Sequence, residues 1–377
     1  MSARQARSVA GRRLRCSACS ASLPAAGTGE QYGGEKRREQ LPHDHRTSDD
    51  LERMRYRYDC RSIAAVHAGV APHIKWFTDP AAHPTDWSLL VSVPVLVAFV
   101  IAVGAIGVAY VLQHRVAEPS IMRTFDRFAT IAPTVLGVHI GVALIASAIV
   151  GVLFSPNLRP NDDLLGYAIL VIEAMGGLML LLGLATRAGA MLLALLGIVA
   201  MLPFTFESVL ENVHILGIAL FFFIVGRGPF SFDRIRRVTP PIRNEDAPTW
   251  ALTLLRLCLG FGIAFTALTE KLLDPSLAQA LLDQRPFLNI VRPFGIGDPQ
   301  FAYLAGLTEL VIGVVVMSGQ LTRPVMAVGA ILFTATVPLF GWTEFLGHLP
   351  FYGIMFVLFM VPNANSWRAK RALRPAA

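Results

Sequence analysis

EAMGGLMLLLGLATR, residues 173–187, recurs 136 residues later as ELVIGVVVMSGQLTR, residues 309–323. The two copies share the glutamate, two glycines and the terminal Thr-Arg, and almost every residue between these points is apolar. A repeated apolar helix indicates a chain built from two related membrane units. Each copy predicts a transmembrane helix with one carboxylate well inside it and one arginine at its end.

The composition agrees with a membrane protein. Of 377 residues, 54% are hydrophobic and only 16% are charged, which is too apolar for an ordinary soluble enzyme. The net charge of +7 is unevenly placed, because 13 of the 33 Lys and Arg precede residue 63. This pattern suits basic loops on one membrane face, with the lipid bilayer and not nucleic acid as the partner.

Apolar segments predict an all-α polytopic membrane protein with about nine transmembrane helices. About 20 apolar residues cross a bilayer core at 1.5 Å per residue. The predicted spans are 89–112, 131–154, 163–185, 188–206, 209–226, 249–272, 301–318, 322–341 and 344–362.

Lys and Arg in the connecting segments predict the orientation. Segments on one side of the membrane carry fourteen of these residues and those on the other carry four. We expect the protein in the inner membrane. The rule that basic loops stay inside then places the C-terminus in the cytoplasm and residues 63–86 on the outer side. The Arg-rich residues 1–62 fit an outside position poorly. They are expected to be a basic disordered tail, with a start near Met54 as the alternative.

The spans group into two four-helix units. The first covers about 128–233 and the second about 249–368, and the helix at 87–113 precedes both. An even number of spans gives the two units the same orientation, so we expect two parallel-repeated four-helix bundles plus one extra N-terminal helix.

The paired residues of the repeat are the first candidate site. Glu173 and Glu309 fall near the middle of the membrane, where a carboxylate is costly and usually faces the protein interior or water. A functional role and a purely structural, protonated glutamate both remain open. Arg187 and Arg323 lie about 21 Å away along their helices and are expected to anchor the cytoplasmic ends.

A second candidate site is an outer-face polar cluster. Four readings remain open for it: a quinone headgroup site, a proton entry point, a metal site built on Glu-x-x-His, or ordinary polar capping. The three histidines His67, His73 and His83 precede it and are interpreted as surface residues. The cluster comprises Glu207, Glu211, His214, Glu270, Lys271, Glu344 and His348.

Three features together resemble the DoxX family of four-helix membrane proteins. They are LRLCLGFGIAFTALTEKLLDP at 255–275, the Glu-x3-Gly-x5-Gly-x2-Thr-Arg pattern in both units, and GRGPFSFDR at 226–234. The first unit departs from the family pattern at Gly151-Val152, which stand in place of Glu270-Lys271. The resemblance covers about 128–368 and implies the family unit twice in tandem. It also implies association with redox complexes, including a thiosulfate:quinone oxidoreductase.

Three classes of function follow. The first is an accessory subunit of a quinone-linked membrane redox system, with a redox partner protein and no covalently bound cofactor. The others are a small-solute or ion transporter that uses the intramembrane glutamates, and a membrane scaffold. The sequence has no P-loop or dinucleotide motif, and its histidines lie at unequal depths for a b-type haem, so no metal or catalytic residue is assigned.

Overall fold

The computed structural model describes residues 73–236 and 247–361. The expectations for residues 1–62, and for the far end of the second unit, lie outside this range. Within it the chain is helical, without strands. The segment ahead of the first long helix consists of three short 3₁₀ turns: η1 Ile74–Trp76, η2 Pro80–Ala82 and η3 Trp87–Val91.

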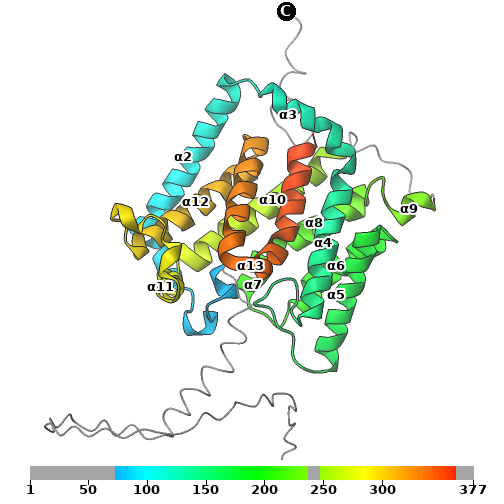
Figure 1. The fold of residues 1–377 in the computed structure, drawn as a ribbon, viewed down its shortest axis with the longest axis horizontal. Helices are drawn as coiled ribbons and strands as arrows, with labels where there is room; N and C mark the ends of the chain where they lie inside the picture. The colour runs from blue at the N-terminus through cyan, green and yellow to red at the C-terminus, as the bar shows by residue number, and fades with distance from the viewer. Residues whose placement is uncertain (1–72, 237–246, 362–377) are drawn as a thin grey trace, which may run out of the picture. The chain divides into compact units, whose positions relative to one another are not determined.

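Helix α2, Val93–Arg115, follows these turns and packs against α12 of the second unit (Figure 1). The short α3, Ser120–Thr124, and the 3₁₀ helix η4, Phe125–Ile131, lead from it into the first unit. The helices of that unit are α4 Ala132–Ile149, α5 Leu164–Leu182, α6 Thr186–Leu195 with the π-helical η5 Leu196–Ala200, α7 Phe206–Glu211 and α8 Val213–Val225.

The second unit follows the short helix α9, Phe232–Ile235. Its helices are α10 Thr249–Ala267 with the π-helical η7 Leu268–Leu272, α11 Pro275–Gln284, η8 Pro286–Leu288, η9 Arg292–Phe294, α12 Asp298–Ser318 and α13 Thr322–Met360. Helix α11 begins at Pro275, where Asp274 caps it by accepting the Leu277 N–H.

Helix α13 is two helices joined at Gly341. That residue has φ 75° and ψ −161°, a conformation open to glycine, and the preceding Pro338 removes a backbone donor. The halves pack side by side, because Thr334 lies 3.2 Å from the Tyr352 hydroxyl and Arg323 donates to the Phe359 carbonyl. The sequence expectation of two spans at 322–341 and 344–362 corresponds to this pair of half-helices.

Residues 136 apart share local structure in the two units. Gly183 and Gly319 end α5 and α12 in the left-handed region, with φ of 64° and 74°. Ala185 and Leu321, two residues later, have φ of 47° and 48°. Positive φ is uncommon for non-glycine residues, so its occurrence at matching positions indicates the same turn in each unit.

Each unit's first helix lies against its second helix at a pair of glycines. A Cβ on Gly141 would lie 2.7 Å from the Gly177 carbonyl oxygen, and one on Gly260 would lie 2.5 Å from that of Gly313. Such contacts are closer than any side chain allows, so the backbones touch directly.

Each unit's last helix packs against the first helix of the other unit (Figure 1). Gly217 on α8 faces Cys258 and Leu255 on α10, whereas Gly353 on α13 faces Leu136 and His139 on α4. This reciprocal packing joins the units through one continuous core of buried apolar side chains.

Six helices of the described residues are long and apolar enough to cross a membrane. They are Val93–Arg115, Ser120–Ile149, Leu164–Leu182, Thr249–Leu272, Asp298–Ser318 and Thr322–Met360, and two shorter apolar helices are Thr186–Ala200 and Val213–Val225. Their surfaces carry many exposed large apolar side chains, as expected for a chain in contact with lipid.

Replacing Gly260 tests the close helix contact. In Gly260→Ala the new methyl group would meet backbone and the Met317 side chain, so we expect a loss of about 1–3 kcal/mol in stability. Gly104→Ala on α2 is the matched control, because nothing lies within 4 Å of its Cβ. Unfolding midpoints in detergent measure both variants. Equal midpoints for Gly260→Ala and the wild type would contradict the contact.

Candidate functional site

Glu173 lies inside the first unit with no exposed surface. Its Oε1 accepts the Phe154 N–H at 2.8 Å, from the loop that follows α4. Phe154 adopts φ 63°, which turns its amide toward the carboxylate. The other carboxylate oxygen has no partner among the described residues. The structure therefore gives this glutamate a backbone partner outside its own helix.

Glu309, 136 residues later, has a different partner. Its Oε2 lies 2.7 Å from Lys271 Nζ, and its side chain keeps 22% of its surface exposed. Gly151-Val152 replace Glu270-Lys271 in the first unit, so a backbone N–H at Glu173 takes the place of the ammonium at Glu309. The two carboxylates share a position but not a chemical environment.

Lys75 joins the two acidic residues of α7 that the sequence assigned to the outer-face cluster. Its Nζ lies 2.5 Å from Glu211 and 3.1 Å from Glu207, and Thr269 donates to the same Glu211 oxygen. Burial opposes the ammonium, but Glu211, Glu270 and Glu207 outweigh it and raise the pKa of Lys75 above 10.5. The lysine therefore stays charged at neutral pH.

The π-helical turn η7 directs three consecutive polar residues to separate partners. Thr269 contacts Glu211, Lys271 contacts Glu309, and Glu270 between them accepts the Ile74 N–H at 2.5 Å. His73 Nδ1 lies 3.8 Å from Glu270. Such π turns are rare and recur at functional sites. Here the turn connects the segment before α2 to the second unit.

Glu344 and His348 lie on the second half of α13, and both are fully buried. Thr336, on the first half, donates to Glu344 at 2.7 Å, and His348 Nδ1 lies 3.3 Å from the same carboxylate. In the first unit, His214 instead contacts the Glu211 carbonyl and packs against Phe351, with ring centroids 4.3 Å apart.

The polar cluster, as the structure has it, thus brings together all seven residues expected at the outer face and adds two more. His73 and Lys75 enter it from the segment before α2 and contact both units. The sequence had placed His73 at the surface. The one feature of the sequence that could have indicated a role for this segment is a lysine among aromatic residues, His-Ile-Lys-Trp-Phe at 73–77. Among the described residues no three His, Cys, Asp or Glu side chains form a metal-sized group.

The two arginines of the repeat differ. Arg187 is exposed at the start of α6. Arg323 is fully buried: it contacts Glu118 at 2.7 Å and Asp126 at 2.5 Å and donates to the Phe359 carbonyl. Arg323 therefore joins the two halves of α13 to the segment that connects α2 with α4, which goes beyond the expected role of an end anchor.

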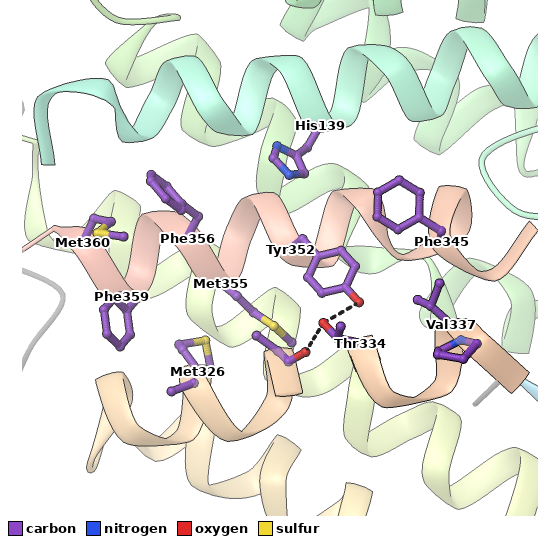
Figure 2. Close-up of a pocket in the computed structure, with 13 residues that line it drawn as sticks. His139, Met326, Thr334, Val337, Phe345, Tyr352, Met355, Phe356, Phe359 and Met360 are labelled. Carbon is purple, nitrogen blue, oxygen red and sulfur yellow. Dashed lines mark hydrogen bonds between the residues drawn. The ribbon is translucent and has the colours of Figure 1, made fainter. Parts of the chain in front are cut away.

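An apolar pocket of about 610 Å³ opens between α4 and the two halves of α13 (Figure 2). Six of its 13 lining residues are methionine or phenylalanine. Three polar side chains reach it: His139 from α4, and Thr334 and Tyr352, which contact each other at 3.2 Å. His139 Nδ1 contacts the Val135 carbonyl at 2.8 Å, which leaves Nε2 as the acceptor. This pocket cannot be predicted from the sequence, because its walls are ordinary apolar helix residues.

The helices and the buried charges between them define an integral membrane protein of the all-helical class. A family model described as DoxX matches residues 136–207, which lie in the first unit and make up about a fifth of the chain. No curated protein and no solved structure matches the chain. The matched segment contains Glu173 and Arg187 and supports a DoxX-like membrane protein.

The Lys75–Glu211 contact can be tested by removing one partner. Lys75→Met leaves Glu211 buried without its cation, so we expect a loss of about 3–5 kcal/mol, partly regained in the double variant with Glu211→Gln. Arg292→Gln, in a solvent-exposed ion pair with Asp298, is the control and should change the stability much less.

The same contact has a defined pH dependence. Because the folded pKa of Lys75 is raised, its stabilisation is complete below about pH 10.5 and is lost as pH rises through the folded pKa. Unfolding midpoints of the wild type and the Lys75→Met variant should therefore converge in strong alkali. A constant difference would contradict the ion pair.

Proposed function

We propose that the chain is an accessory subunit of a quinone-linked membrane redox system, and that the pocket of Figure 2 admits the quinone from the bilayer. The observation that carries this proposal is the pocket itself. It is large enough for a drug-sized molecule, is lined mainly by apolar side chains, and has a few hydrogen-bonding groups at one place. A quinone fits such a pocket, because its apolar body suits the apolar walls and its carbonyl oxygens can bond to the few polar side chains.

The position of the pocket supports entry from lipid. Thr334 and Pro338 are exposed, so the pocket reaches the surface of two apolar helix halves. The Thr334 hydroxyl donates to the Ala330 carbonyl, so the Tyr352 hydroxyl donates to Thr334 in this structure. By turning away from Thr334, Tyr352 can donate to a quinone carbonyl instead, whereas His139 Nε2 can accept from a quinol hydroxyl. Electrons would come from a partner redox protein, and the subunit would hold the lipid-soluble carrier without a covalently bound cofactor.

A tandem DoxX-like architecture forms part of the proposal. Positive-φ turns and carboxylates at positions 136 residues apart, together with one direct glycine contact between the first two helices of each unit, support two copies of one four-helix unit. Counting α13 as two spans, and including the two shorter apolar helices, the proposed topology has nine spans in the inner membrane with a cytoplasmic C-terminus.

The quinone site is tested by filling the pocket. Ala330 lines it, so Ala330→Trp should abolish co-purification of quinone and lower the affinity for an added short-tail quinone at least tenfold. Ala335→Trp, five residues later on an exposed face, is the matched control and should retain both. A wild-type protein that neither carries nor binds quinone would refute the proposal and favour a transporter or a scaffold.

The topology is tested separately. A reporter that is active only in the cytoplasm, fused after Ala377, should be active, and the same reporter inserted at Pro80 should be inactive. The reverse pattern would invert the proposed orientation, whereas equal activity at both positions would contradict an odd number of spans.

A further inference from the structure

Glu344 and His348 are fully buried ionisable side chains with unused hydrogen-bonding capacity. Within residues 73–236 and 247–361, Glu344 Oε2 and both ring nitrogens of His348 have no hydrogen-bond partner. Buried polar groups in proteins are nearly always satisfied by protein or by water. Three such atoms on adjacent turns of one helix therefore indicate that the pair works with a further occupant, a water molecule or a proton.

Aromatic rings surround the histidine. Phe333 stacks on His348 with centroids 4.3 Å apart, while Trp76 and Tyr352 lie at 5.9 Å and 6.3 Å. Aromatic faces stabilise a cation, and Glu344 provides the counter-charge 3.3 Å away. Complete burial favours the neutral ring, so the histidine can relay a proton while Glu344 holds it.

His73 lies between this pair and Glu270. Its ring centroid lies 5.9 Å from that of His348, and its Nδ1 lies 3.8 Å from Glu270. The His73 side chain keeps 12% of its surface exposed, whereas that of His348 has none. A cavity of about 10 Å³, the size of one water, borders His73 and Trp76 together with Glu211 and His214, and so gives His73 a polar neighbourhood on the side away from His348 and Glu344.

The remaining charged groups near Glu344 come from two other elements. Glu344 interacts electrostatically with Lys271 and Glu270 on η7 and with Glu309 on α12. On its own helix, it interacts electrostatically with Tyr352. Lys271, Glu270 and Glu309 therefore lie close enough to influence the charge of the pair.

We propose that Glu344 and His348 form an internal proton-binding site that exchanges protons with water at the polar-cluster end through His73. A proton passes from bulk water to His73, then to His348, whose ring centroid lies 5.9 Å away, and on to Glu344, and it returns by the same route. Only O–H and N–H bonds form and break. Tyr352 adjoins His348 and also lines the pocket of Figure 2, so the site can exchange a proton with a bound headgroup. That last use rests on the proposed quinone function, whereas the proton site does not.

Infrared pH-difference spectroscopy on the full chain in quinone-free lipid bilayers tests the site. We expect a protonated-carboxyl band that titrates with bulk pH and is absent in Glu344→Gln. Glu173→Gln is the matched control, because Glu173 is equally buried but accepts a backbone N–H, and it should leave that band in place. A band that ignores pH, or that persists in Glu344→Gln, would overturn the proposal.

Two further variants test the pairing and the route. His348→Gln should move the pH midpoint of the Glu344 band, and an unchanged midpoint would contradict the pairing. In D₂O, His73→Phe should slow deuterium exchange of the band at least tenfold, whereas His83→Phe, at a histidine that contacts Ser276, should not. Equal exchange in His73→Phe and the wild type would overturn the route. Because these bilayers hold no quinone, failure here leaves the quinone-binding result unaffected, and the reverse also holds.

Discussion

A charge inside an apolar environment has to be compensated, and this constraint explains much of the arrangement. Ionised groups are costly in hydrocarbon, so each buried carboxylate needs a cation, an amide or a hydroxyl. Glu211 has Lys75, Glu309 has Lys271, Glu173 has a backbone N–H and Glu344 has Thr336. The partners come from elements far apart in sequence, so compensating the charges also fixes how the helices meet.

The sequence predicts the features that depend on local pattern. The apolar helices and the inward position of Glu173 follow from hydrophobicity and spacing, since a membrane helix must hide its polar groups from lipid. The two spans on either side of Gly341 are likewise predicted from local hydrophobicity. These predictions need no knowledge of which helices are neighbours.

The partners of the charged residues could not be predicted in this way. Lys75 and His73 belong to a short irregular segment, and only the folded arrangement shows that they lie beside Glu211 and Glu270. The burial of Arg323 likewise depends on a segment some 200 residues earlier, which supplies Glu118 and Asp126. The matching Arg187 has no such segment and stays exposed. Matching positions in two similar stretches of sequence therefore have different surroundings.

The placement of the segment before α2 has a consequence for biosynthesis. Ile74 bonds to Glu270 and Lys75 to Glu211, across separations of 196 and 136 residues, and the Trp76 ring covers Gly347. This segment leaves the ribosome before any of these partners exists. It can dock only after the last helix pair has been inserted, although synthesis runs from the N-terminus. The first described part of the chain to be made is thus among the last to reach its final position, and its docking reports that both units are complete.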